Sequence, residues 1–334
     1  MKVEFINIKR LFDSNALWLS MLIGALGYKL FLPLRPLLPW LIFFMLFFTF
    51  CKVNPLDLRL HKWHWVVLVT QILLSLAAYA CTLYLTHNSF LAQGLLMCFI
   101  MPTATAAPII AGKLGGSIQN LTAFTLLSNF ATAFIVPALF PLIYPAADMS
   151  FWQAFLLILS RICPLLLGPF FAAWLLRIGY KRRTKKEFVL SKGIAQTPFY
   201  LWVASIVVLT ATVTETVISN YQLQITNMLI LLASSFFACL LQFGLGKWIG
   251  YKLPAASKGK DYQDVLINPA AAPKTMAGVS SITAGQAFGQ KNTSLGVWMA
   301  QTYLHPMAAL GAAAYIIWQN LFNSLQLAIA AHKK

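Results

Sequence analysis

Long hydrophobic runs separated by short polar segments occur along nearly the whole chain. A helix needs about 20 apolar residues to cross the roughly 30 Å hydrocarbon core of a bilayer. The pattern therefore predicts an all-α polytopic membrane protein with ten transmembrane helices. Small residues dilute the apolar signal of the last three, which is typical of helices that pack closely inside a membrane protein. The expected spans are 14–32, 37–53, 63–86, 90–112, 117–144, 151–178, 190–213, 223–250, 262–289 and 293–330.

The composition agrees with this class. Of the 334 residues, 59% are hydrophobic and 10% are charged, whereas soluble domains contain about 25% charged residues. Transmembrane β-barrels alternate polar and apolar residues along short strands, and the long unbroken runs exclude that class. The five cysteines lack metal-ligand spacing, so we expect neither a thiolate metal site nor a cofactor.

The formal net charge of +17 is spread over short loops rather than over one face of a folded domain, so we expect no nucleic-acid partner. In the ten-span arrangement, 20 Lys and Arg residues lie on the side of both termini, and three (Lys29, Arg35 and Lys291) lie on the opposite side. Positively charged loops stay in the cytoplasm. We therefore expect both termini there, and the protein in the plasma (inner) membrane.

A basic run at 181–186 divides the chain into two halves of five spans each. Five is an odd number, so the second half has to insert with the opposite orientation. Inverted repeats of this kind are common in secondary transporters. We expect a first five-helix repeat over residues 1–147 (spans one to five) and a second, inverted repeat over residues 148–334 (spans six to ten).

Paired prolines interrupt two of the expected spans. The fourth span contains Pro102 and Pro108, and the ninth contains Pro269 and Pro273. Proline removes a backbone donor and clashes with the preceding turn. Interrupted helices at matching positions of two halves point to a transporter's central site; ordinary proline kinks are the alternative interpretation. The polar residues at the two breaks are candidates for the site: Thr103, Thr105, Lys274 and Thr275.

Several stretches, taken in order, resemble the bile acid:sodium symporter family from the second span onward. They are the break at Pro102, the Gly115-Gly116 loop, the polar helix that ends at Pro137, and the segment Trp318-Gln319-Asn320-Leu321-Phe322-Asn323-Ser324. The resemblance implies ten helices in two inverted repeats, with a core of spans three to five and eight to ten in which the broken spans four and nine cross. The panel would contain spans one, two, six and seven. Family substrates are amphipathic or small organic anions, often driven by sodium.

The resemblance also carries over two sodium ligands, Gln71 in the third span and Thr125 in the fifth. Two departures count against sodium coupling. The family's Ser-Asn pair falls here on Ala107 and Pro108, and its ninth-span glutamate falls at or beside Lys274-Thr275. We hypothesise that Lys274 stands where related proteins place a sodium ion, which leaves proton coupling open.

Other polar residues inside the spans are candidates for lining the site, with interhelical hydrogen bonding as the alternative role. A charge near the middle of a span is costly and usually functional, which makes Arg161 a candidate anion contact. Gln301 and His305 fit either a structural hydrogen bond or a titrating or substrate-binding role. The remaining candidates are Thr122, Ser128, Asn129, Ser280 and Ser281.

These features predict a secondary active transporter that moves a small organic anion by alternating access. Its expected partners are the anion, a coupling ion (sodium or protons) and the lipid bilayer. A channel or an intramembrane scaffold is the main alternative. An intramembrane enzyme is disfavoured because it needs paired carboxylates, a zinc motif or an activated nucleophile. The eight acidic residues all lie in termini, loops or span edges.

Overall fold

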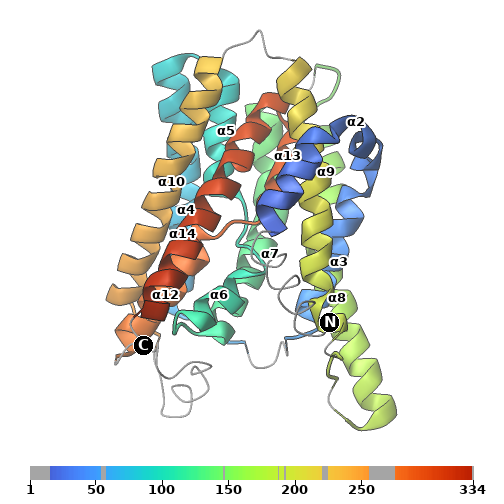
Figure 1. Cartoon of the computed structure of the whole chain (residues 1–334), viewed down its shortest axis with the longest axis vertical. Coiled ribbons are helices and arrows are strands. Elements are labelled where there is room, and N and C mark those ends of the chain that lie inside the picture. The colour runs from blue at the N-terminus through green and yellow to red at the C-terminus, as the bar shows by residue number, and fades with distance from the viewer. Residues whose placement is uncertain are drawn as a thin grey trace, which may run out of the picture. The chain divides into compact units, whose positions relative to one another are not determined.

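The computed structural model describes seven stretches of the chain: 16–53, 58–145, 147–186, 188–191, 193–219, 225–255 and 275–332. Within them the secondary structure is helical, and the extended backbone is confined to one isolated β-bridge. Figure 1 labels the α-helices. The helical elements in chain order are α2 (Tyr28–Phe31), η1 (Leu32–Leu37), α3 (Leu38–Phe50), α4 (Lys62–Thr86), α5 (Ser89–Ile100), α6 (Ala107–Lys113), α7 (Ile118–Ile143), α8 (Phe151–Thr184), η3 (Ile194–Gln196), α9 (Thr197–Ser219), α10 (Ile225–Lys252), α12 (Met276–Gly289), α13 (Thr293–Tyr303), η5 (Pro306–Ala308) and α14 (Ala309–His332).

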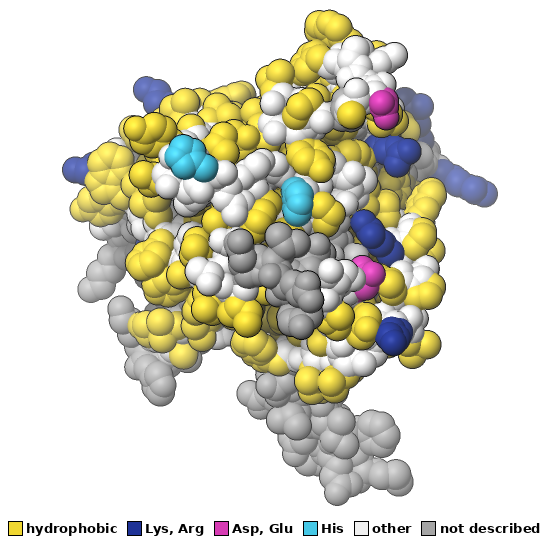
Figure 2. Space-filling view, turned by 90° about the horizontal axis from the view of Figure 1, so that it is seen from above, with side chains coloured by type: hydrophobic (Ala, Val, Ile, Leu, Met, Phe, Trp, Pro, Cys, Tyr) yellow, Lys and Arg dark blue, Asp and Glu magenta, His cyan; other side chains and the backbone are white. Residues whose placement is uncertain are grey.

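The helices have the length and composition of membrane-spanning segments, which confirms the predicted class of an α-helical membrane protein. Large apolar side chains point outward from them, for example Leu26 (79% exposed) and Tyr84 (80% exposed). On the face drawn in Figure 2, hydrophobic and uncharged side chains predominate. Six helical segments in the described part of the chain can cross a bilayer: Tyr28–Phe50, Lys62–Thr86, Ile118–Ile143, Phe151–Thr184, Ile194–Ser219 and Ile225–Lys252. Ala16–Leu26 and α5 are shorter apolar helices.

The chain forms two compact units. Unit 1 consists of Met1–Lys52 and Gly168–Leu223, and unit 2 consists of Val53–Leu167 and Gln224–Lys334. Because Gly168 lies inside α8, this long helix contributes to both units. The two interrupted helices discussed below belong to unit 2.

Unit 1 packs helix against helix through small and aromatic residues. Gly24 lies in the helix Ala16–Leu26, and a Cβ atom there would overlap the backbone of α9. These two helices therefore approach each other closely at Gly24. Phe50 and Phe170 make an edge-to-face contact with ring centroids 5.7 Å apart. At the end of α3, the ammonium of Lys52 donates to the carbonyl oxygen of Ala195 at 2.7 Å. Close packing and a few polar contacts therefore hold this unit together.

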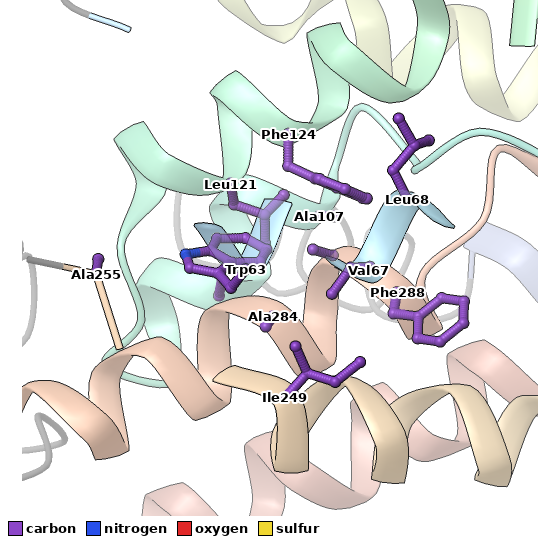
Figure 3. Close-up of a cluster of buried hydrophobic side chains, with 12 residues drawn as sticks. Trp63, Val67, Leu68, Ala107, Leu121, Phe124, Ile249, Ala255, Ala284 and Phe288 are labelled. Atoms are coloured by element: carbon purple, nitrogen blue, oxygen red, sulfur yellow. The ribbon is translucent and has the colours of Figure 1, made fainter. Parts of the chain in front are cut away.

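Unit 2 contains a buried apolar cluster to which five helices contribute. Figure 3 shows side chains of α4, α6, α7, α10 and α12 converging there. Trp63 and Phe124 have ring centroids 5.7 Å apart within it. Because small alanines lie between the large rings, the helices approach closely. The cluster consists of Trp63, Val67, Leu68, Ala107, Ala111, Leu121, Phe124, Ile249, Ala255, Ala284, Ala287 and Phe288.

The structure corrects the predicted end of the chain. The expected tenth span, 293–330, is two helices, α13 and α14, which are separated around Pro306. The residues expected in an external loop between spans nine and ten, 290–292, are buried between α12 and α13. Lys291, which was counted with the external charges, is only 1% exposed. The sequence pattern places Lys291 in a loop because a lysine in a short polar run is typical of one.

Candidate transport site

Two interrupted helices meet inside unit 2. The chain leaves the helical conformation between α5 and α6 and again between α12 and α13, and the two breaks are joined by an antiparallel bridge between Thr103 and Lys291. The Ala104 N–H donates to the Gln290 carbonyl oxygen at 3.0 Å, and the Asn292 N–H donates to the Pro102 carbonyl oxygen at 2.7 Å. Irregular backbone at membrane depth is tolerated only where it is buried in protein or lines a cavity. We call residues 101–106 and 290–292 the crossing.

The first break lies where the prolines predicted it. Helix α5 ends at Ile100 and α6 begins at Ala107, with Pro108 in its first turn, where a missing N–H is harmless. Pro102 cannot continue α5, and its carbonyl oxygen is used across the bridge instead. The predicted interruption of the fourth span is therefore confirmed.

The second break contains no proline. Gly289 is the last residue of α12, and the side chain of Asn292 caps α13 by accepting from the Leu295 N–H at 3.2 Å. Asparagine is a preferred N-cap residue because its side-chain oxygen satisfies a free helix donor. The prolines predicted to break this span, Pro269 and Pro273, lie outside the described residues, as does Lys274.

Two side chains satisfy carbonyl groups at the ends of α5 and α12. The Nε2 atom of Gln71, on α4, donates to the carbonyl oxygens of Ile100 (3.3 Å) and Met101 (3.0 Å). The hydroxyl of Thr103 donates to the carbonyl oxygen of Ala287, on α12, at 2.7 Å. The last carbonyl groups of a helix have no partner within it. These bonds thus take the place of the helical bonds that the break removes.

A second group of side chains, from α10 and α14, serves the other break. The Tyr315 hydroxyl donates to the carbonyl oxygen of Gly289 at 2.8 Å and accepts from Nε2 of Gln242 at 3.1 Å. The amide of Gln319 accepts from the Lys291 N–H at 2.8 Å and donates to the Lys291 carbonyl oxygen at 3.2 Å. Gln242 also donates to the carbonyl oxygen of Cys98, near the end of α5, at 3.1 Å.

Residues 41–332 match the SBF-like CPA transporter family. The chain belongs to this family. No curated protein matches the sequence. The predicted resemblance is confirmed at this level, because the family is of the bile acid:sodium symporter type. It is a family of transporters, and the membrane-spanning helices of the chain agree with that.

Three residues predicted for the site of this SBF-like transporter do lie together at the crossing. Gln71 binds the carbonyl groups at the end of α5, and Thr103 binds the Ala287 carbonyl oxygen near the end of α12, as described above. The hydroxyl of Ser128, on α7, accepts from the Thr103 N–H at 3.2 Å. All three are at least 98% buried. Their common role in the structure is to bind backbone groups of the break.

Other predicted residues bind their own helix. The hydroxyls of Thr122 and Thr125 donate to carbonyl oxygens one turn earlier in α7. The amide nitrogen of Asn129 does the same, while its Oδ1 atom is buried without a hydrogen-bond partner, as is Oε1 of Gln71. Thr105 is half-buried within the first break. Together with Oε1 of Gln242, these amide oxygens are acceptors near the crossing that have no hydrogen-bond partner.

The remaining predicted residues lie elsewhere in the SBF-like transporter. Arg161 is exposed on α8, and Thr275 is an exposed N-cap of α12. Ser280 accepts from the Ala255 N–H, and Ser281 donates to a carbonyl oxygen of α10, so both fasten α12 to its neighbours. Gln301 is buried in α13. The described contacts bring none of these five to the crossing.

Five residues at the crossing were not among the predicted site residues: Gln242, Lys291, Asn292, Tyr315 and Gln319. The sequence does point to two of them, because an amide side chain in a long apolar run is unusual and needs a hydrogen-bond partner. Gln242 interrupts the eighth expected span in this way, and Gln319 lies in the last stretch that resembles the symporters. Tyr315 is an ordinary residue for a membrane helix and gave no signal.

Proposed function

We propose that this protein is a secondary active transporter that moves a small organic anion across the plasma (inner) membrane by alternating access. The observation that carries the proposal is the buried crossing of two interrupted helices, joined by the Thr103–Lys291 bridge. Transporters of several folds place substrate and coupling ions at such interrupted helices near the bilayer midplane. Membership in a transporter family supports the same conclusion.

We further propose that ten helices form two inverted repeats, divided between residues 147 and 148. In this arrangement α5 with α6 is the broken fourth helix of the first repeat, and α12 with α13 is the broken ninth. Helix α14 is then the tenth. Spans three to five and eight to ten form the core, and spans one, two, six and seven form the panel. The two interrupted helices, joined by the bridge between Thr103 and Lys291, support this correspondence.

Sodium is the weaker candidate for a coupling ion, and protons remain an alternative. A sodium ion is held by oxygen ligands, and the unpartnered oxygens of Gln71 and Asn129 are neutral. The hydroxyl of Thr125 is already engaged with its own helix. Among the described residues of unit 2, the single acidic side chain is that of Asp148, which is exposed.

The transport proposal predicts saturable uptake with counterflow. Purified protein is screened for ligands by thermal unfolding against a panel of carboxylates, sulfonates and sulfates, with and without sodium, because a ligand that binds only the folded state raises its stability. Anions that raise the melting temperature are then tested for uptake into proteoliposomes. We expect saturation and exchange against internal anion.

A matched pair of variants links this uptake to the crossing. Thr103→Val removes the bond to the Ala287 carbonyl oxygen and is expected to lower the initial uptake rate by at least about 10-fold, since a barrier increase of about 1.4 kcal/mol has that effect. Thr302→Val removes a bond to its own helix only and should leave uptake unchanged. Flux that rises linearly with anion concentration and shows no counterflow would indicate a channel, and the absence of any flux a scaffold.

Both termini are proposed to lie in the cytoplasm. Lys291 is one of the three basic residues expected on the opposite side, and it is buried rather than in a loop. The excess of Lys and Arg in the loops on the side of the termini is therefore larger than the sequence pattern indicates. A reporter that is active only outside the cytoplasm, fused after Lys334, is expected to be silent, and the same reporter inserted after Arg35 should be active. A strong signal from the Lys334 fusion would contradict the ten-helix arrangement.

A further inference from the structure

The side chain of Lys291 is buried in the second break without a polar partner. It is 1% exposed, and its Nζ atom has no hydrogen-bond partner. The Nζ atom lies 5.1 Å from the ring centroid of Phe288, in the last turn of α12. The thiols of Cys98, on α5, and Cys239, on α10, are the titratable groups that interact with it electrostatically. An aromatic ring therefore lies beside the Nζ atom, and the titratable groups that interact with it are both thiols.

The crossing does not need this ammonium as a structural cap. Its backbone groups are already satisfied by neutral side chains: Gln319 binds both backbone groups of Lys291, and Tyr315 binds the last carbonyl of α12. Taking an ion out of water costs several kcal/mol even after the protein relaxes. A cation–π contact returns about 2 kcal/mol. Stability alone therefore does not explain a lysine at this position.

No described group neutralises the charge. In the described part of unit 2 the single acidic side chain, Asp148, is exposed on the segment between α7 and α8. Buried charges in proteins are normally paired with an opposite charge or bound to a metal. Lys291 thus has the features of one half of an ion pair whose other half comes from a ligand.

We propose that Lys291 binds the anionic group of the transported substrate and supplies the positive charge that this group requires, so that binding does not depend on sodium. The ligand class is an organic anion with a carboxylate or sulfonate group. A lysine ammonium is a compact cation with three donors and suits such a group. This inference rests on the proposed function, because the anion reaches Nζ only when the transport cycle opens the crossing.

The test compares charged and neutral ligands with the same skeleton. The probes are cholate, octanoate and benzenesulfonate, with cholamide, octanamide and benzenesulfonamide as their neutral counterparts. Binding is measured by thermal unfolding of purified protein, with choline as the only added cation. We expect at least one of the anions to raise the melting temperature of the wild type, its amide to have no effect, and sodium to add nothing.

Lys291→Met keeps the length and apolar contacts of the side chain but removes its charge. Truncating one partner of a buried charge pair costs 2 kcal/mol or more, so the variant should bind the anion at least about 30-fold more weakly. Its melting temperature without ligand should equal or exceed that of the wild type, because the unpaired ammonium is lost. Lys113→Met, at an exposed lysine in the last turn of α6, is the matched control and should bind like the wild type.

The outcomes separate the inference from the function on which it rests. If Lys291→Met binds the anion as tightly as the wild type, Lys291 is not the binding residue, although anion transport stands. If the wild type binds only when sodium is present, or binds the amide equally well, the inference is refuted without any variant. If no organic anion binds at all, the inference and the proposed substrate class both fail.

Discussion

Replacing Gln319 by alanine is expected to abolish transport and to lower the melting temperature by several degrees. One side-chain amide serves both the N–H and the carbonyl oxygen of Lys291, at 2.8 Å and 3.2 Å. Each buried backbone group left without a partner costs about 1–3 kcal/mol. Because two groups lose their partner, the free energy of unfolding should fall by about 2–6 kcal/mol. In larger domains each kcal/mol lowers the melting temperature by roughly 2–4 °C. Thermal unfolding in detergent measures this loss.

Transport should be strongly affected as well. Gln319 fixes the backbone from which the Lys291 side chain projects, and small displacements at a reacting or binding centre have large effects. We expect uptake of an identified anion to fall at least about 100-fold, as a barrier increase of about 2.7 kcal/mol produces.

Asn320→Ala is the matched control, because Asn320 is the next residue of α14 and its amide donates only to the Ile316 carbonyl oxygen of its own helix, at 2.7 Å. The free energy of unfolding of this variant should fall by less than about 1 kcal/mol, and its uptake of the anion should match that of the wild type. Equal losses in the two variants would show that the bonds of Gln319 to the second break have no special importance.

The first break could be predicted from the sequence and the second could not. Pro102 and Pro108 lie close together, and each lacks a backbone N–H and clashes with the preceding turn, so the pair disfavours a continuous helix. The residues of the second break, Gln290 to Asn292, leave the helix for tertiary reasons: Asn292 donates to Pro102, and Gln319 binds the backbone of Lys291 from 28 positions along the chain. Neither contact is visible in a local pattern of residues.

The same limit applies to the site residues. Gln71 was predicted and lies at the crossing, but its amide nitrogen binds helix-end carbonyl groups. Thr122 was predicted from its residue type and Thr125 from the resemblance to the symporter family, and neither says whether a hydroxyl points to a cavity or to the preceding turn. A lysine in a polar run is assigned to a loop by charge rules, and only the packing around Lys291 shows that it is buried.

A second large loss of stability is expected from the double variant Gly246→Ala, Gly250→Ala. The two glycines lie one turn apart on α10 and face α12, and α10 and α12 are neighbours in Figure 1 as well. A Cβ atom at Gly250 would overlap the carbonyl oxygen of Ser280, and one at Gly246 would overlap that of Ala284. Two small residues four positions apart allow helices in a membrane to approach this closely.

Because the clashing atoms are backbone, α12 cannot accommodate the methyl groups by turning a side chain and has to move away from α10. Overpacking costs about 1–3 kcal/mol at each site. The free energy of unfolding of the double variant should therefore be lower than that of the wild type by about 2–6 kcal/mol. We expect it to unfold at least several degrees below the wild type, or to fail to yield monodisperse protein in detergent size-exclusion chromatography.

Gly244→Ala, on the same helix, is the control. A Cβ atom there meets no atom within 4 Å, and alanine is the better helix former by about 1 kcal/mol, so this variant should be as stable as the wild type or slightly more stable. If the double variant matched Gly244→Ala, α10 and α12 would not be in contact through this surface. Because α12 ends directly before the second break, a displaced α12 also moves Lys291 away from Thr103 and the first break. The single variant Gly250→Ala should therefore lose anion binding at temperatures where it is still folded.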